Sequence, residues 1–499
     1  MNDKASTVGD TRVLSRNDDV WYLRVTSRPS PWCFKGARSL GTLLLLLGCL
    51  PISAVTLPLR VSGGEYFDKL VAARKCNGIK VKQNGEFGKG VYAVSDFKED
   101  ELILKDQILV GAQHISNQFD CLVCSFCFQF VGSVEFQIGR KLFLQSLGVS
   151  SSNHCDEGEC SSSCSQDGVS LPKEVIESLM NGELVLPYSD KFPLPSYVPC
   201  PGGCAEAFYC SEQCAEADWE SSHSLLCTGE SSQSLSREAL TKFMQHANET
   251  NDIFLLAAKT IAFTILRYKK LKAGHVRERD KGKSIDGSDL SLLLEAWKPV
   301  SIGYKRRWWD CTSPPEHTLD CSDGAAFRME VRELAFESLQ LLKAAIFDEE
   351  CEPLFSLEIY GNIIGMFELN NLDLVVASPV EDYFLYIDDL PSPEKNKAEE
   401  ITQPFLDALG DDYTDCCRGT AFYPLQSCMN HSCCPNAKAF KRDEDRDGQA
   451  TIIALRPISR GEEVTISYID EDRPYEERRT LLADYGFKCK CARCLEEEP

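Results

Sequence analysis

The sequence has few basic residues for its length, and this shortage limits the partners that the protein can bind. Lysine and arginine number 53 against 76 aspartate and glutamate residues, which gives a formal charge of −23. A surface with this balance repels the phosphates of DNA and RNA, so we do not expect direct nucleic-acid binding. The same surface either attracts a Lys/Arg-rich protein segment or serves only to keep the protein in solution.

A long hydrophobic run is also lacking. The main apolar stretch, residues 42–55, is shorter than the about 20 residues that a transmembrane helix needs. Lys35 and Arg38 precede it, as in a signal peptide, but it begins later in the chain than such leaders do. We interpret residues 1–60 as an N-terminal extension, which is a targeting segment, an extended gene-model start, or a disordered arm with a short apolar helix. Membrane attachment is expected only if residues 42–55 are retained as an anchor.

Cysteine, in contrast, is abundant, with 25 residues. A secreted disulfide scaffold would normally be short and would carry a signal peptide. Here the cysteines cluster at spacings typical of metal ligands, which favours a reducing compartment and zinc bound by thiolates.

Strand-like segments lie towards both ends of the chain, and helical patterns lie between them, which predicts an α+β fold. The predicted strands are residues 79–82, 91–94, 102–104, 374–376, 383–386 and 451–455. Residues 254–268 read as a helix, and residues 331–345 place apolar side chains on one face at the helical period. We expect residues 148–170 and 275–288 to be loops, and the acidic, proline-containing segment 388–415 to be an exposed insertion.

Paired zinc-ligand spacings occur between residues 121 and 227. The pairs are Cys121-x2-Cys124, Cys200-x3-Cys204, Cys210-x3-Cys214 and His223-x3-Cys227. Four pairs suffice for two tetrahedral sites. The stretch between Cys124 and Cys200 adds further candidates, namely Cys127, His154, Cys155, Cys160 and Cys164, so the individual ligands stay open at this point. A third thiol group, Cys489-x-Cys491-x2-Cys494, stands near the C-terminus and needs a fourth ligand.

The most informative stretch runs from Asn430 to Asn436, with the sequence Asn-His-Ser-Cys-Cys-Pro-Asn, and Gly461 to Tyr468 follows it. No packing or capping rule asks for these residues together. The stretch resembles the core of a SET-domain lysine methyltransferase, which implies S-adenosylmethionine as the cofactor and a protein lysine as the substrate.

The cysteine pairs are similar to those of a MYND zinc finger, because Tyr209-Cys210-Ser211 and Trp219 accompany them. In that family the pairs interleave, which would place Cys121, Cys124, Cys210 and Cys214 on one zinc ion and Cys200, Cys204, His223 and Cys227 on another. SET enzymes with a cysteine-rich tail take the fourth ligand from the Asn-His-Ser-Cys motif. Cys433 would therefore join Cys489, Cys491 and Cys494, for three zinc ions in all.

The resemblance also implies roles for residues around the cofactor and the substrate. Gly88, Lys89 and Gly90 form a strand turn where a ligand can approach the backbone closely. The other expected cofactor contacts are Asn371 (or Asn370 if the alignment slips by one), Asn430, His431, Tyr468 and Phe487. Tyr468 would orient the methyl group and the incoming nitrogen, and Tyr485 and Phe487 would line the lysine channel.

The order of these motifs resembles the split type of SET protein, a β-rich SET domain of small sheets interrupted by a MYND-like finger and a helical insert. The expected boundaries are 66–470 for the SET domain, 121–227 for the finger, 235–358 for the insert and 471–499 for the zinc-binding tail. The resemblance implies a nuclear enzyme that methylates histone H3 and whose finger binds transcription-factor or corepressor peptides. The alternatives are an inactive adaptor, or a methyltransferase of a non-histone protein in the cytoplasm or a plastid.

Overall fold

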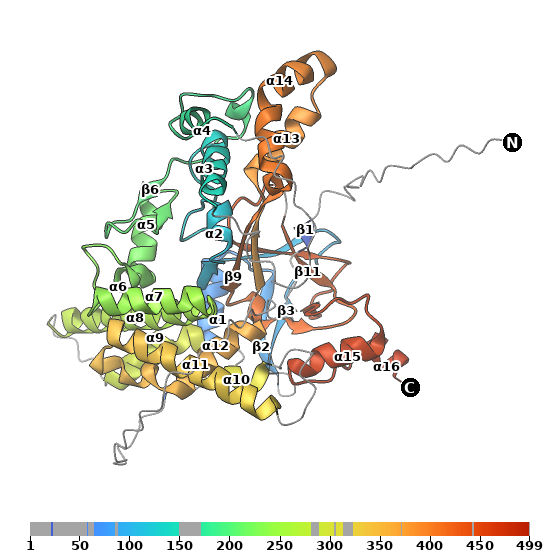
Figure 1. The fold of residues 1–499 in the computed structure, drawn as a ribbon. Helices are drawn as coiled ribbons and strands as arrows, with labels where there is room; N and C mark the ends of the chain where they lie inside the picture. Colours follow the sequence, from blue (N-terminus) through green and yellow to red (C-terminus); the bar gives the residue numbers. More distant parts are fainter. Residues whose placement is uncertain are drawn as a thin grey trace.

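The computed structural model describes ten segments of the chain, and small sheets lie at the centre of the molecule between groups of helices (Figure 1). The described residues are 21–22, 57, 64–84, 88–148, 171–280, 289–303, 306–312, 323–370, 372–441 and 444–498. The expected loop at 148–170, apart from its first residue, and the apolar stretch 42–55 lie outside them. None of the described helices combines the length and the apolar character that a membrane crossing requires.

The strands form several short sheets rather than one large one. The orders are β1-β11-β12-β4, β10-β13-β3-β2, β5-β9-β8 and β6-β7. The bounds are β1 Trp21–Tyr22, β2 Ile79–Asn84, β3 Gly88–Ala93, β4 Leu102–Asp106, β5 Val110–Gln113, β6 Val198–Pro199, β7 Phe208–Tyr209, β8 Leu372–Val376, β9 Cys417–Phe422, β10 Asn430–His431, β11 Ala437–Lys441, β12 Ala450–Ala454 and β13 Glu463–Ile466. The strands predicted near residues 80, 91, 103, 375 and 452 are confirmed.

These sheets join strands that are far apart in the sequence. The N-terminal hairpin β2–β3 pairs through β3 with β13, with Val91 opposite Val464. Both valines are fully buried. Side chains of a strand alternate between the two faces of the sheet, so these paired residues lie on the same, buried face. Strand β4 likewise pairs with β12. The two ends of the chain therefore build one domain around the insertions, and the predicted α+β class is confirmed.

Helices fill the sequence between the two groups of strands. The bounds are α1 Gly64–Ala73, α2 Asn117–Asp120, α3 Val134–Ser146, α4 Lys173–Met180, η2 Ser189–Lys191, α5 Glu212–Asp218, η3 Trp219–His223, α6 Ser224–Leu226, α7 Arg237–Glu249, α8 Ile253–Asp280, α9 Asp289–Ser301, α10 Trp308–Cys311, α11 Asp323–Ile346, η4 Glu349–Phe355, α12 Leu357–Asn370, α13 Pro379–Asp388, α14 Ser392–Leu409, η5 Gly410–Thr414, η6 Gln426–Cys428, α15 Tyr475–Asp484 and α16 Ala492–Glu497.

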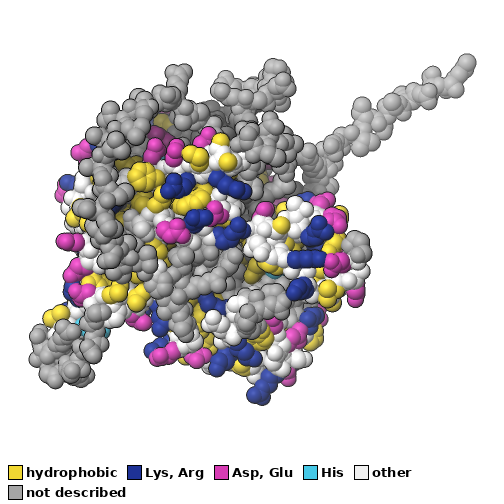
Figure 2. Space-filling model, turned by 90° about the horizontal axis from the view of Figure 1, so that it is seen from below, with side chains coloured by type: hydrophobic (Ala, Val, Ile, Leu, Met, Phe, Trp, Pro, Cys, Tyr) yellow, Lys and Arg dark blue, Asp and Glu magenta, His cyan; other side chains and the backbone are white. Residues whose placement is uncertain are grey.

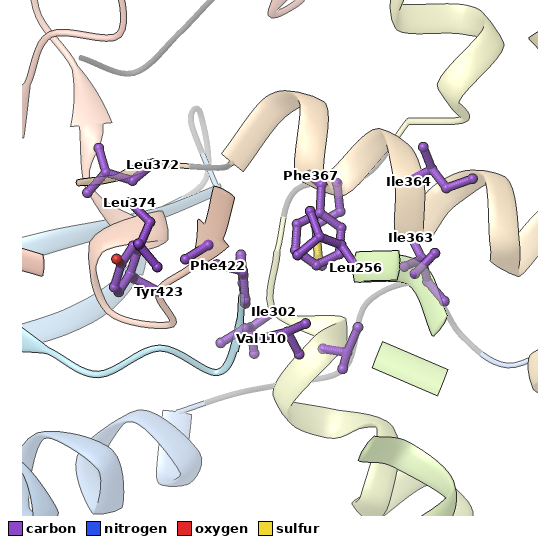
Figure 3. Close-up of a cluster of buried hydrophobic side chains, with 14 of the residues drawn as sticks. Val110, Leu256, Ile302, Ile363, Ile364, Phe367, Leu372, Leu374, Phe422 and Tyr423 are labelled. Atoms are coloured by element: carbon purple, nitrogen blue, oxygen red, sulfur yellow. The ribbon is translucent and has the colours of Figure 1, made fainter. Parts of the chain in front are cut away.

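The predicted helices at 254–268 and 331–345 are confirmed as parts of α8 and α11. The expected loop at 275–288 is wrong in its first part, because α8 continues to Asp280. Figure 3 shows how these helices meet the sheets: Leu256 of α8 and Phe367 of α12 lie near Val110 of β5 and Phe422 of β9. All four side chains are buried in one hydrophobic core. This shared core holds the C-terminal end of α12 against the strands of the SET region.

A second hydrophobic core lies at the top of Figure 1, where α3 and α4 pack against α13 and α14. One prediction is wrong here, because residues 383–386 form part of helix α13 and not a strand. The segment 388–415 is mostly the helix α14, which is exposed over more than half of its residues but buries Ala398, Thr402, Phe405 and Leu409. The apolar residues of these segments recur at helical spacing, so that Tyr383, Phe384 and Ile387 face the same core as Phe405 and Leu409.

A buried lysine fastens this second core to the sheet. Lys141 of α3 donates to the carbonyl of Asp412 at 2.8 Å and forms an ion pair with Asp415. Its ammonium also lies 3.8 Å from the carboxylate of Asp120. The chain enters β9 directly after Asp415, so this network sets where the inserted helices leave the SET region.

We predict that Phe405→Ala opens the second core without opening the first. Loss of a buried phenylalanine ring costs about 3 kcal/mol or more, because the cavity is refilled only in part. Hydrogen exchange should show reduced protection in α13 and α14 and unchanged protection in α8. An equal loss of protection in all three helices would show that the two cores unfold as one unit.

Candidate active site and zinc centres

The two most informative motifs of the sequence lie side by side. Asn430 and His431 form β10, which runs parallel to β13 and pairs Asn430 with Thr465 and His431 with Ile466. The amide of Ser432 then donates to the carbonyl of Ile466 at 3.0 Å. The first motif is therefore bound along the second, and Tyr468 follows directly after the end of this pairing.

Asn436 locks the two motifs together. Its Oδ1 accepts the Thr465 amide at 2.8 Å, and its Nδ2 donates to the Glu463 carbonyl at 2.8 Å and to Glu462 Oε1 at 3.0 Å. The side chain is buried, so these partners would otherwise lack hydrogen bonds. This residue closes the Asn-His-Ser-Cys motif, yet sequence reasoning assigned it no role.

Asn430 connects the same motif to the predicted glycine turn, whose residues Gly88, Lys89 and Gly90 form the start of strand β3. Its Nδ2 donates to the carbonyl of Lys89 at 2.9 Å and to Glu463 Oε1 at 2.7 Å. Gly90 allows this approach, because a Cβ atom there would lie 2.4 Å from Glu463 Oε1 and 3.3 Å from Asn430 Nδ2. The Lys89 ammonium points elsewhere, to the carbonyl of Ile302.

A buried carboxylate positions the turn that precedes Asn430. Asp106 accepts the amides of Leu425 and Gln426 at 2.7 and 2.9 Å and forms an ion pair with Arg74. Two backbone amides and one guanidinium thus compensate its burial. The polar residue Asp106 at the end of an apolar strand was the one sequence signal for this contact, and it was missed.

Four aromatic rings gather after the crossing of the motifs. The ring centroid of Tyr468 lies 5.4 Å from His431, 5.2 Å from Tyr485 and 6.4 Å from Phe487. His431 Nδ1 accepts the backbone amide of Tyr468 at 3.0 Å, and the Tyr468 hydroxyl donates to the carbonyl of Met429. The structure therefore brings together Tyr468, Tyr485, Phe487 and His431, as the sequence predicted.

Burial keeps both tyrosines in the neutral form. Burial raises the pKa of Tyr468 well above its usual value, and the thiol of Cys428 and the carboxylate of Glu463 add to the shift. Burial also raises the pKa of Tyr485, with a further contribution from Tyr468. Both hydroxyl groups can therefore donate a hydrogen bond throughout the physiological pH range.

The surroundings of Gly88 fit a bound cofactor. Gly88 has φ +84°, and a Cβ atom added there would meet no heavy atom of the described residues within 4 Å. Gly88 is the first residue of β3, and the carbonyl of the next residue, Lys89, accepts the bond from Asn430. Asn371 lies outside the described residues. The alternative, Asn370, is buried and donates to the carbonyl of Met366 at 3.0 Å within its own helix.

The C-terminal cysteines meet Cys433, as predicted. The ligand atoms of Cys433, Cys489, Cys491 and Cys494 all lie within 4.8 Å of one another. The thiol of Cys433 lowers the pKa of Cys489 through a hydrogen bond, which favours a thiolate in the group. His431 Nε2 lies 3.2 Å from Cys433 Sγ, so the four-cysteine group borders the aromatic site directly.

The second predicted set of finger ligands also comes together. Cys200, Cys204, His223 and Cys227 form one group, with His223 Nε2 3.2 Å from Cys200 Sγ and 3.4 Å from Cys204 Sγ. Gly202 makes room for the group, because a Cβ atom there would lie 2.5 Å from Cys227 Sγ.

The first predicted set needs one correction. The structure groups Cys127, instead of Cys121, with Cys124, Cys210 and Cys214. The turn after Cys124 is tight, because the Phe128 amide bonds to the Cys124 carbonyl at 2.8 Å and Phe128 has φ +65°. This turn brings Cys127 Sγ to 3.5 Å from Cys210 Sγ. The spacing alone could not decide, since both candidate pairs have two intervening residues.

Cys121 lies in a different environment. Its thiol donates to the carbonyl of Asp415 at 3.4 Å and accepts Asn117 Nδ2 at 3.7 Å. Burial raises its pKa well above the usual value, which keeps it a neutral thiol. Cys121 is thus part of the hydrophobic core and not of a metal centre.

Comparison with known proteins defines the class. The MYND finger family matches residues 194–227, and the SET domain family matches residues 322–469. SET methyltransferases use S-adenosylmethionine, and the three Cys/His groups of the structure fit zinc binding. The chain belongs to the SET- and MYND-domain family of protein-lysine methyltransferases.

Two of three named relatives match most of the chain, and the third matches a short part of it. Histone-lysine N-methyltransferase ATXR2 of Arabidopsis thaliana is 70% identical over 448 residues, which cover 87% of this chain and 93% of the relative. Protein-lysine N-trimethyltransferase SMYD5 of Gallus gallus is 22% identical over 426 residues, 82% of this chain and 84% of the relative. Histone-lysine N-methyltransferase ASHR2 of Arabidopsis thaliana is 42% identical over 84 residues, 16% of this chain and 21% of the relative.

We predict that Cys127→Ala lowers the bound zinc of the purified protein from three ions to two per chain, because a tetrahedral site loses one of its four ligands. Elemental analysis by mass spectrometry measures the content. Cys121→Ala is the matched control and should retain three ions. The reverse result would restore Cys121 as the ligand.

We also predict that Asn436→Ala loosens the crossing of the two motifs. The free energy of opening at the Thr465 amide should fall by about 3 kcal/mol, since a buried donor and a buried carbonyl lose their partner. Hydrogen exchange measures it. Asn248→Ala, on an exposed helix position, should leave it unchanged. If protection at Thr465 survives in Asn436→Ala, the asparagine does not lock the motifs.

Proposed function

We propose that this protein is an S-adenosylmethionine-dependent protein-lysine N-methyltransferase that acts on a histone, with the H3 tail as its substrate, in the nucleus. The observation that carries the proposal is the group of Tyr468, Tyr485, Phe487 and His431 around the crossing of the two motifs. The 70% identity to a histone-lysine N-methyltransferase supports the choice of substrate class.

The residues near the glycine turn are proposed to hold the cofactor. Gly88, Lys89 and Gly90 would contact it through their backbone, together with Asn371, Asn430 and His431. Phe487 and Tyr468 would cover its reactive end. When bound, S-adenosylmethionine supplies a methyl group on a positively charged sulfur.

Tyr468, Tyr485 and Phe487 are proposed to form the channel for the target lysine. Lysine reacts as the neutral amine, yet at a pKa of about 10.4 only about one in a few thousand is neutral at pH 7. Aromatic walls exclude water and thereby lower the pKa of the amine. The neutral hydroxyl of Tyr468, held by its bond to the Met429 carbonyl, is then placed to orient the nitrogen for an in-line attack.

The surface charge supports a basic substrate without confining it to one patch. The formal charge of −23 attracts a Lys/Arg-rich tail. Figure 2 shows basic and acidic side chains interspersed on the face seen from below, so recognition must depend on local groups as well as on net charge. The MYND finger is proposed to bind transcription-factor or corepressor peptides.

The domain boundaries follow from the same proposal. The SET domain would span residues 66–470, with the finger region at 121–227 and the helical insert at 235–358, and the zinc-binding tail would span 471–499. Residues 1–60 would be an extension outside these units.

We predict that Tyr468→Phe lowers methyl transfer to core histones by about 100-fold, because the site loses an oriented hydroxyl group. Transfer of a radiolabelled methyl group measures the rate, and calorimetry should show that S-adenosylmethionine still binds. Tyr197→Phe, at an exposed tyrosine, is the control and should keep full activity.

Other outcomes would point to the alternative functions. If the unmodified protein binds S-adenosylmethionine but transfers no methyl group to any protein, an adaptor role is favoured. If it methylates a cell extract but not histones, the substrate is a non-histone protein.

A further inference from the structure

At the end of α12, next to Leu369 of the aromatic cluster, lies a carboxylate that has no ion-pair partner among the described residues. Glu368 is in the last turn of α12, and its Oε1 accepts the indole N–H of Trp308 at 3.0 Å. No ion pair involves Glu368 among the described residues, and its Oε2 has no recorded hydrogen bond there. The residue is half-buried, and one of its oxygens is fixed by the indole of Trp308.

The neighbours of Glu368 make this an unusual place for a negative charge. Leu369 packs with Tyr485 in a buried cluster that Tyr468, Phe487 and Cys311 border. Burial raises the pKa of Glu368 to about 7, and the charge of Asp252 adds to the shift, whereas the Trp308 bond opposes it. A cation bound beside this carboxylate would stabilise its charged form.

Among the described residues, the groups linked to Glu368 by a hydrogen bond or by charge are Asp252, Trp308, Cys311 and Tyr485, and none of them is a cation that pairs with it. Asp252 precedes α8, Trp308 and Cys311 belong to α10, and Tyr485 follows α15. Arg306, at the same junction, donates instead to the carbonyls of Asp484 and Asp310, at 3.3 and 2.9 Å. A basic group of a bound substrate would complete the site.

The position of Glu368 indicates which cation of a substrate it would bind: the target lysine or a basic side chain that flanks it. Burial raises the pKa of Tyr485, and Tyr468, Asp484 and then Glu368 add to it. For Tyr468 the contributing carboxylate is Glu463. Leu369, the next residue of α12, packs in one cluster with Tyr485, and Arg306 donates to the carbonyl of Asp484 beside that tyrosine, so the end of α12 lies at the Tyr485 side of the aromatic group. A side chain that flanks the target lysine is the cation that fits this place.

We propose that Glu368 recognises a lysine or arginine side chain that neighbours the target lysine in the substrate. The inference rests on the proposed methyltransferase function and narrows its substrate class to lysines with a basic neighbour. Glu368 is then a specificity-determining residue, since its carboxylate contacts the flanking side chain and not the reacting nitrogen.

The test uses the full-length, zinc-loaded protein and pairs of histone H3-tail peptides. In each pair, one peptide carries arginine beside an acceptor lysine and the other carries citrulline, which has the same shape without the charge. At pH 8 the arginine peptide should have a kcat/KM about tenfold higher, in line with a charged hydrogen bond. At pH 6 the preference should shrink, because Glu368 is protonated below its pKa of about 7. Glu368→Gln should show less than a twofold preference at both pH values.

Glu358→Gln is the matched control, because this exposed glutamate lies on the same helix and should leave the preference intact. An equal arginine preference in the unmodified protein and in Glu368→Gln would overturn the proposal. Fluorescence anisotropy of the same labelled peptides provides a readout that does not need methyl transfer. If no peptide is methylated, the proposed function fails, while a binding preference that Glu368→Gln abolishes still supports recognition by Glu368.

Discussion

The side chain of Asn436 is the contact on which the site depends. It binds the Glu463 carbonyl and the Thr465 amide of β13, on either side of Val464, and thereby holds the Asn-His-Ser-Cys segment along the strand that leads to Tyr468. Without this lock, the two segments would be joined mainly by the short β10–β13 pairing. The hydrogen bond from the Tyr468 amide to His431 Nδ1 depends on the same crossing.

The zinc centre of the tail extends this crossing to the end of the chain. Cys433 lies two residues after His431, so the metal group that includes Cys489 shares a segment with the proposed cofactor site. A closed zinc site contributes on the order of 10 kcal/mol to folding. That energy can hold Tyr485 and Phe487, which precede Cys489, against Tyr468. The tail thereby supplies one wall of the proposed lysine channel.

The insertions bear on the site in different ways. The helices α8 and α12 share a core with the strands, and α12 brings Leu369, the neighbour of Glu368, into the cluster of Tyr485. The helices α13 and α14 have a core of their own, attached through Lys141. The first insertion can therefore influence substrate choice directly, whereas the second is joined to the sheets through β8 and β9 and through the ion pair of Asp382 with Arg446.

Local chemistry made much of the molecule predictable. Alternating apolar residues identified β2, β3, β4, β8 and β12, and the 3.6-residue period identified α8 and α11. The aromatic group and two of the three metal groups agreed with the motifs. Residues 383–386 were predicted as a strand, because a short apolar run does not distinguish a strand from a buried helix. The helix in 388–415 was not predicted, because acidic, proline-containing sequence does not reveal that a neighbouring core will cover one side of it.

The sequence by itself determined the motifs, the types of ligand and the class of protein, because each depends on residue identity and on short spacing. The tertiary structure decided which residues meet. It chose Cys127 over Cys121 through the turn at Phe128. It also placed Asp106 against Leu425, 319 residues away, and Glu368 against Trp308 of another helix. Contacts of this kind arise from packing between distant segments, and no local pattern encodes them.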